Sequence, residues 1–185
     1  MLIAYILHQF EEHWIDLYGN YSAFYDFNNN FILKSLGAPD SQVKPLTKES
    51  IFMINTSLVW LVGMLGIISS PKRLFPLICM AGIIMVNGVV HILAAIATAH
   101  YNPGLLTSIL VFIPFYVWFV RFLVRQPGPY KNQIIFGVIW AFLAHIIMVS
   151  GLLMANWFNL FPEIVYFITL VIWSILPVAL FRKEQ

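Results

Sequence analysis

Long stretches of the chain contain no Asp, Glu, Lys or Arg, and this feature constrains the fold more than any other. The longest stretch extends from Leu74 to Val120, and others cover 50–71, 132–162 and 164–181. A helix needs about 20 mostly apolar residues to cross the hydrocarbon core of a bilayer, so each stretch is long enough for at least one crossing. Hydrophobic residues make up 61% of the chain and charged residues 10%, whereas a soluble domain carries about 25% charged residues. The sequence therefore predicts an integral membrane protein of the all-α class.

Turn-forming residues divide these stretches into five spans. Asn-Pro-Gly at 102–104 interrupts the longest stretch, and Pro-Gly-Pro at 127–129 separates two later ones. Thr47 has the residue type of an N-cap for the first span. Residues 2–18 are expected to form a further, amphipathic helix, a sixth that either crosses the membrane or lies at its surface. We expect one membrane-embedded domain, 1–185, with spans at about 48–69, 75–100, 104–126, 131–155 and 160–182.

The basic residues predict the orientation of the bundle, because Lys and Arg concentrate in cytoplasmic loops. Glu184 is the one acidic residue on the predicted basic side. We expect a multi-pass protein of the bacterial cytoplasmic (inner) membrane with its C-terminus in the cytoplasm and residues 20–46 outside. That outer connection is rich in aromatic residues, which favours a short helix or lid resting on the bundle over a gate above a site. The basic residues of the predicted cytoplasmic side are Lys72, Arg73, Arg121, Arg125, Lys131, Arg182 and Lys183.

Polar residues of the spans fall at similar depth. With the predicted orientation and a rise of about 1.5 Å per residue, His91, Asn87 and His145 lie in the outer half of the bilayer, as do the polar residues near Asn55 and Thr107. Polar groups inside a bilayer are costly and usually face the bundle interior. Their shared depth predicts a polar cluster in the outer half of the bundle.

The N-terminal helix supplies the acidic members of this cluster. At 100° per residue, His8, Glu11, Glu12 and Asp16 share one face about 140° wide, with His13 at its edge. The outer half of the spans offers these carboxylates no Lys or Arg, so their partners are histidines, directly or through a metal ion. Imidazole and carboxylate are the ligands expected for Zn²⁺ or Fe²⁺. We expect a divalent metal site, with a metal-free hydrogen-bonded network as the alternative. The predicted metal ligands are His8, Glu11, Glu12, His91 and His145.

Three short motifs resemble those of a known family. The string His-Gln-Phe-Glu-Glu at 8–12 resembles the signature of the HXXEE family of small multi-span membrane proteins. Asn-x-x-x-His at 87–91 and Tyr-x-Pro-Gly at 101–104 are similar to later elements of that family. The resemblance covers roughly the first 110 residues. It implies that His8, Glu11, Glu12, Asn87 and His91 belong to one site, and it implies no reaction.

The leading functional hypothesis is a membrane-embedded metal-dependent enzyme, a hydrolase that acts on a lipid or another small apolar substrate from the outer half of the bilayer. Glu11 or Glu12, whichever does not bind the metal, would be the general base, and Asn87 and Thr107 would orient the ligands. One alternative is a transporter or an ion- or proton-conducting protein. Another is a subunit that binds haem through His91 and His145. His100 is interpreted as an interfacial residue without a special role, and nothing in the chain indicates a nucleic-acid partner.

Overall fold

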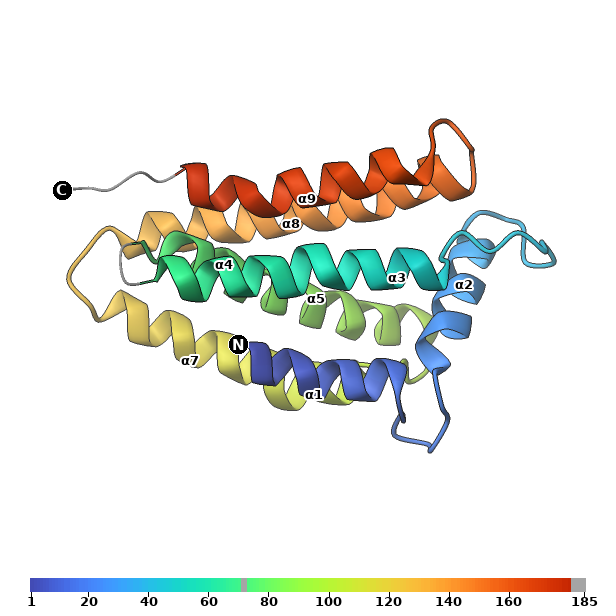
Figure 1. Cartoon of the computed structure of the whole chain (residues 1–185). Coiled ribbons are helices and arrows are strands. Elements are labelled where there is room, and N and C mark those ends of the chain that lie inside the picture. Colours follow the sequence, from blue (N-terminus) through green and yellow to red (C-terminus); the bar gives the residue numbers. More distant parts are fainter. Residues whose placement is uncertain (71–72, 181–185) are drawn as a thin grey trace.

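A computed structural model describes residues 1–70 and 73–180. Within these ranges the chain is helical, and the only β-type pairing is an isolated antiparallel bridge between Ile15 and Tyr21. Five helices are long and apolar enough to cross a membrane, so the predicted all-α bundle with five spans is confirmed (Figure 1). The spans are Lys48–Ser69, Phe75–Thr98, Leu105–Val124, Tyr130–Asn156 and Glu163–Leu180. The elements are α1 (Leu2–His13), α2 (Ala23–Ser35), α3 (Lys48–Ile54), η1 (Asn55–Leu61), α4 (Val62–Ser69), α5 (Phe75–Thr98), α6 (Leu105–Thr107), η2 (Ser108–Phe112), α7 (Ile113–Val124), α8 (Tyr130–Asn156) and α9 (Glu163–Leu180), where η denotes a π-helical segment.

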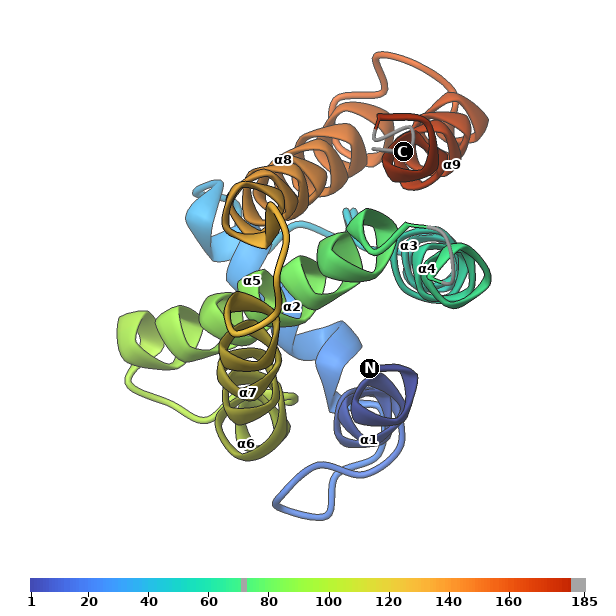
Figure 2. The ribbon, with the colours of Figure 1, turned by 90° about the vertical axis from the view of Figure 1, so that its left-hand side faces the viewer.

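Helix α5 is the centre of the bundle. In its most apolar 18-residue window 56% of the residues are buried, against 22–33% in the other four spans. Figure 2 shows α5 passing between α8 on one side and α7 on the other. The crossing of α5 and α8 depends on two glycines, because a Cβ added at Gly82 would lie 2.7 Å from the carbonyl oxygen of Gly137. Small residues at such crossings allow membrane helices to approach closely.

Two of the spans contain a π-helical turn, which the sequence analysis did not predict. The first span changes from α3 to η1 at Asn55, and the third changes from α6 to η2 at Ser108. Such segments are rare and often occur at functional sites. The first span begins at the predicted N-cap, because the Thr47 side chain accepts a hydrogen bond from the Ser50 amide.

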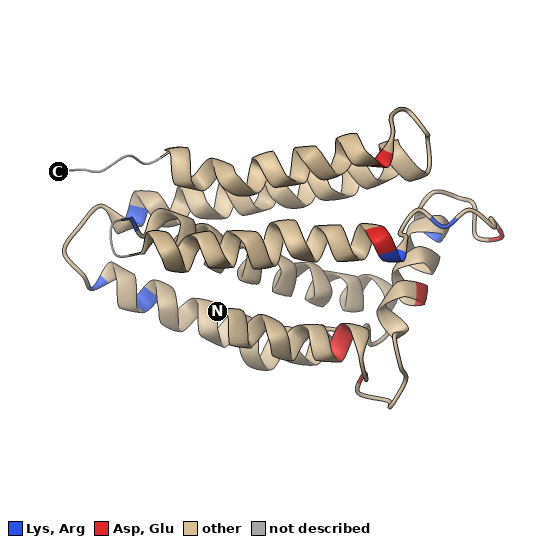
Figure 3. Ribbon diagram, viewed as in Figure 1, with Lys and Arg blue, Asp and Glu red and all other residues tan. Residues whose placement is uncertain are grey.

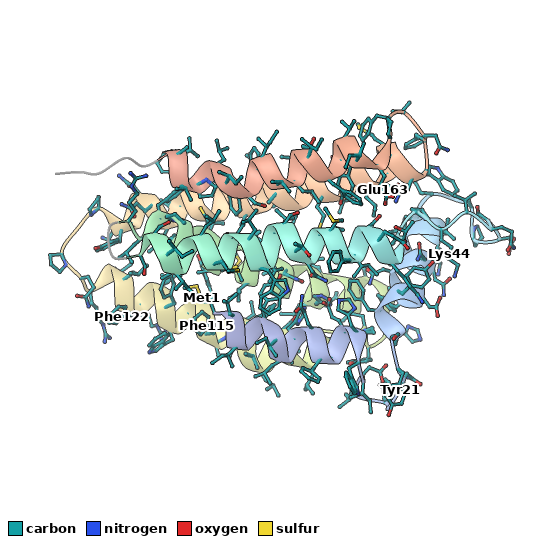
Figure 4. All side chains as sticks on the ribbon, viewed as in Figure 1. Met1, Tyr21, Lys44, Phe115, Phe122 and Glu163 are labelled. Carbon is teal, nitrogen blue, oxygen red and sulfur yellow. The ribbon has the colours of Figure 1, made fainter. Side chains whose placement is uncertain are left out.

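Helix α1 forms as predicted but ends at His13 rather than at residue 18. Its 12 residues rise about 18 Å, too short for a hydrocarbon core of about 30 Å. It lies alongside α6 and η1 with its first residue midway along the bundle, where Figure 4 shows Met1 beside Phe115. The buried face of α1 is its polar face, which includes His8, Glu11 and Glu12, while apolar residues such as Ile3 are exposed. This arrangement is the reverse of a helix on a soluble protein and fits contact with lipid.

Helix α2 lies across one end of the bundle, which we call the α2 end (Figure 1). Its aromatic face, with Phe24, Phe27 and Phe31, lines the cavity described below. The side chain of Asn29 fixes α2 by two hydrogen bonds to the backbone of Leu46, of 2.9 and 3.0 Å. The connection from α1 to α3 thus contains a short helix that lies across this end of the bundle.

Acidic and basic residues are distributed unequally between the two ends. In Figure 3 the acidic residues lie at the α2 end. Among the charged residues that the structure describes, those at the opposite end are all basic. Arg73 precedes α5, Arg121 and Arg125 lie on or next to the last turn of α7, and Lys131 lies in the first turn of α8. Lys72, Arg182, Lys183 and Glu184 fall outside the described residues. This distribution is the one on which the predicted orientation depends.

Candidate metal centre

Three of the predicted ligands converge in the α2 half of the bundle. The ligand atoms of His8, Glu12 and His91 lie within 4.8 Å of one another, and all three residues are buried. Glu12 Oε1 lies 3.4 Å from His8 Nε2 and 3.1 Å from His91 Nε2. Two ligands of one tetrahedral ion, each about 2.1 Å from the metal, are about 3.4 Å apart. The two distances between the carboxylate and the imidazoles therefore fit a single divalent cation.

The hydrogen bonds of His8 determine which of its nitrogens faces Glu12. Its Nδ1 lies 2.8 Å from the hydroxyl of Thr107, and that hydroxyl donates its single proton to Glu11 Oε2. The hydroxyl oxygen must therefore accept a proton from Nδ1. In a neutral His8 this leaves the lone pair on Nε2, a buried atom that has no hydrogen-bond partner.

His91 has the same tautomer for a different reason. The amide of Asn102 donates from Nδ2 to the carbonyl oxygen of His91 at 2.9 Å, which turns its Oδ1 toward His91 Nδ1 at 2.7 Å. Nδ1 therefore carries a proton, and Nε2 of a neutral His91 directs its lone pair at Glu12. Metal-binding histidines have this pattern, with one nitrogen on the metal and the other donating to a neighbouring acceptor.

An ionised Glu12 requires a cation in this cluster. Within the described part of the chain, the ion-pair partners of Glu12 are all histidines: His8, His91 and, at 3.7 Å, His13. A buried carboxylate without a compensating charge is costly. The cation is either a protonated imidazole or a metal ion. The metal site and the metal-free hydrogen-bonded network, the two alternatives of the sequence analysis, therefore involve the same three residues.

Glu11 lies outside the group, and its surroundings differ from the prediction. Its carboxylate accepts hydrogen bonds from the backbone amides of Leu106 and Thr107 and from the hydroxyls of Tyr101 and Thr107. Burial raises the pKa of the Tyr101 hydroxyl, the Leu17 amide opposes this, and neighbouring Glu11 raises it further. Tyr101 is therefore protonated and donates its hydrogen bond. Glu11 is thus not in the three-residue group, and its carboxylate contacts Thr107, which in turn contacts His8.

The connection from α5 to α6 approaches both imidazole rings. Gly104 has φ +96°, and a Cβ added there would lie 2.6 Å from His91 Cε1 and 2.8 Å from His8 Cε1. Only glycine combines this left-handed backbone with so close an approach. Asn102 and Gly104 were not among the predicted site residues, although the Tyr-x-Pro-Gly motif of the sequence was the signal that could have identified them.

The group opens into an apolar cavity of about 260 Å³. Glu12, His91 and Asn102 line one wall of it, and Leu152 lies among the apolar residues of the remaining lining. The predicted residue Asn87 also lines the cavity, and its side-chain amide donates to the Tyr5 hydroxyl at 2.8 Å. The predicted residue Thr107 lies between His8 and Glu11, as described above.

His145 lines the same cavity but is not a member of the three-residue group. Its Nδ1 lies 2.9 Å from the carbonyl oxygen of Ala141, one turn earlier in α8. Nδ1 therefore donates, and Nε2 carries the lone pair of the neutral ring. His145 thus shares the cavity with the group without joining it.

The remaining polar residues near the site have local partners. Asp16 accepts hydrogen bonds from the amides of Tyr18 and Asn20; burial raises its pKa, but these bonds outweigh that effect and hold the pKa below its ordinary value. His100 is exposed, and its Nδ1 contacts the carbonyl oxygen of Thr98, in agreement with its interpretation as an interfacial residue.

Comparison with known proteins identifies the family. No curated protein and no solved structure matches the chain. Residues 1–119 match a family described as "Protein of unknown function with HXXEE motif". The matched region includes the whole group and the loop that supports it, and it ends before His145. The chain therefore belongs to the HXXEE family.

Proposed function

We propose that the protein is a membrane-embedded, metal-dependent hydrolase that acts on a lipid or another small apolar substrate. The observation that carries this proposal is the convergence of three buried ligand atoms within 4.8 Å of one another, two of them on imidazoles whose Nδ1 protons are already bound elsewhere. Three protein ligands leave a fourth position open, the arrangement of catalytic rather than structural zinc sites. Zn²⁺ and Fe²⁺ both suit this ligand set.

The cavity indicates the substrate. A divalent ion in this group would polarise a carbonyl or activate a water molecule, and the cavity beside it is lined mainly by apolar side chains from α2, α3, α5 and α8. Such a lining binds hydrocarbon and excludes most water. An ester or amide of an apolar chain fits both parts of the site. Its polar bond would lie at the His8/Glu12/His91 group, and its hydrocarbon chain would occupy the apolar cavity.

The residues of the chain divide the work between them. His8, Glu12 and His91 would hold the ion. Thr107 with Glu11, and Asn102, would orient the two imidazoles. His145, with an unprotonated Nε2 and a place on the cavity wall, replaces Glu11 as the proton acceptor in our proposal.

The alternatives fit the geometry less well. A conduit needs polar groups through both halves of the bundle, but Phe75, Cys79 and Met80 are almost completely buried in an apolar core on the other half of α5. Haem ligation through His91 and His145 needs a free Nε2 on His91, but that nitrogen lies 3.1 Å from Glu12 Oε1.

Hydrolysis of a panel of long-chain esters by the purified protein in detergent tests the proposal. We expect release of fatty acid that is lost on chelation and restored by Zn²⁺ or Fe²⁺, and that falls at least about 100-fold in His91→Ala and in His145→Asn. His100→Ala is the matched control and should retain activity, because His100 is exposed and contacts only residue 98. Ester hydrolysis that withstands both chelation and His91→Ala would contradict the proposal.

A further inference from the structure

A second hollow lies on the outside of the bundle, between α1 and the first span. This groove has a volume of about 500 Å³ and is lined largely by apolar side chains, among them Phe10, Trp14, Phe52 and Trp60. Phe10, Trp14 and Phe52 are between 52% and 67% exposed. Because the first span is long and apolar enough to cross a membrane, we expect this exposed face to meet lipid.

The groove and the cavity share a wall. His13, Ile51 and Asn55 line both. His13 Nε2 lies 3.2 Å from Asn55 Nδ2, so a single hydrogen bond joins α1 to the first residue of η1. The side chain of His13 retains 31% of its accessible surface. The wall is therefore thin, and its polar part consists of one solvent-accessible pair.

The route to the cavity past α2 is closed. Helix α2 covers the cavity at the end of the bundle, and it is anchored by the completely buried Asn29 through two hydrogen bonds to Leu46. Leu33 of α2 is also buried, with 2% of its surface exposed. Opening from this end would break both hydrogen bonds and expose an apolar contact, whereas opening toward the groove breaks one.

The cavity is small for a complete ligand. Its volume of about 260 Å³ lies below the roughly 300–1,000 Å³ of typical ligand sites. A long-chain ligand that reaches the His8/Glu12/His91 group must therefore extend beyond the cavity, and the groove is a hollow that shares a wall with it.

We propose that the groove and the cavity form one continuous binding site for a single acyl or alkyl chain, which enters sideways from the membrane past the His13–Asn55 pair. His13 and Asn55 are positioning residues of this site, because they separate the two hollows and touch no metal ligand atom closer than 3.7 Å. The inference rests on the proposed function, because the chain would belong to the substrate of the proposed hydrolase. Its test does not depend on that function.

A long-chain fatty alcohol with a photoactivatable diazirine at its chain end is the probe, and the labelled residues of the protein in detergent are mapped by mass spectrometry. We expect labels on Met148 and Leu152, which line the cavity on α8. Ile51→Trp fills the shared wall and should reduce these labels several-fold. Ile67→Trp, the same substitution in the same span but on a groove that does not share the cavity's lining, is the matched control and should leave them unchanged.

A second pair of variants tests the same proposal in case Ile51→Trp does not fold. His13→Ala removes the hydrogen bond to Asn55 and should increase the labels on Met148 and Leu152, and His13→Gln retains an amide that can bond to Asn55 and should match the wild type. Equal labelling in Ile51→Trp and the wild type, or labelling raised by Asn29→Ala but not by His13→Ala, would overturn the proposal. Because labelling needs neither metal nor turnover, it can be repeated in His91→Ala, so its failure is distinguishable from failure of the metal-dependent function.

Discussion

At the scale of single residues, the site depends on groups that do not face the cavity. Thr107 has one hydroxyl proton and gives it to Glu11, and this forces His8 to donate from Nδ1. Asn102 does the same for His91 by bonding to its backbone and its ring together. Adjacent carboxylates thus have different roles: Glu12 joins the ligand group, and Glu11 fixes the tautomer of a ligand.

The first prediction concerns the hydroxyl of Thr107. Thr107→Val keeps the shape of the side chain but removes one hydrogen bond from Glu11 and one from His8. We expect the affinity for Zn²⁺ to fall about 10–100-fold, measured by competition with a chromogenic chelator. Thr107→Ser should retain the affinity, and so should Thr98→Val, because the Thr98 hydroxyl bonds only within its own stretch of chain. An unchanged affinity in Thr107→Val would show that the hydrogen bonds from Glu11 through Thr107 to His8 do not position the ligand.

The second prediction concerns Gly104. An alanine there meets both imidazole rings and also adopts a left-handed backbone, which costs about 1–2 kcal/mol by itself. Gly37→Ala is the matched control, since Gly37 has φ +70° but no atom within 4 Å of an added Cβ. We expect a lower midpoint of thermal unfolding in both variants, and loss of metal binding only in Gly104→Ala. Metal binding preserved in Gly104→Ala would show that the loop does not hold the rings.

At the scale of elements, α2 determines whether the cavity is closed. Asn29→Ala removes two buried hydrogen bonds and leaves the backbone groups of Leu46 unpaired, at a cost of about 2–3 kcal/mol in unfolding free energy. Asn28→Ala is the control, because Asn28 bonds only to the Phe24 carbonyl within its own helix. Faster proteolysis between α2 and α3 in Asn29→Ala than in Asn28→Ala is the expected result. Equal rates would mean that other contacts hold α2.

The elements also show what the sequence can and cannot predict. The five spans were predictable because uncharged stretches and turn residues determine where a membrane helix begins and ends. The end of α1 at His13 was not, because Trp14 to Tyr18 continues the amphipathic pattern while Asp16 folds the chain back by binding the amides of Tyr18 and Asn20. The two π-helical segments carry no signal in the pattern of apolar residues.

At the scale of the whole molecule, the position of a residue in the sequence predicts how far along the bundle its side chain lies. It does not predict toward which neighbouring helix the side chain points. His91 and His145 line the same cavity, yet of the two only His91 has its Nε2 at Glu12, and the sequence does not distinguish them. Which of two adjacent carboxylates faces the histidines was equally beyond the sequence, since that depends on the loop donors of Tyr101 and Thr107.

The orientation of the whole bundle is a further prediction. The only cysteine, Cys79, is buried, so single cysteines added at the surface can be labelled selectively. If basic residues mark the cytoplasmic side, Ser41→Cys should react with a membrane-impermeant maleimide in intact cells, and Gln126→Cys should react only after the membrane is permeabilised. Labelling with the two accessibilities exchanged would invert the orientation and place the site in the inner half of the bilayer.

The central claim is that His8, Glu12 and His91 together bind one divalent cation. Its most direct test is the metal content of the purified protein after incubation with Zn²⁺ and gel filtration, for the wild type, His8→Ala, Glu12→Gln and His91→Ala, with His100→Ala as the control. We expect about one Zn²⁺ per chain in the wild type and in His100→Ala, and a near-complete loss in each of the other three variants. A wild type without stoichiometric metal, or three variants that bind Zn²⁺ as the wild type does, would contradict the claim and leave a protonated imidazole as the counter-charge of Glu12.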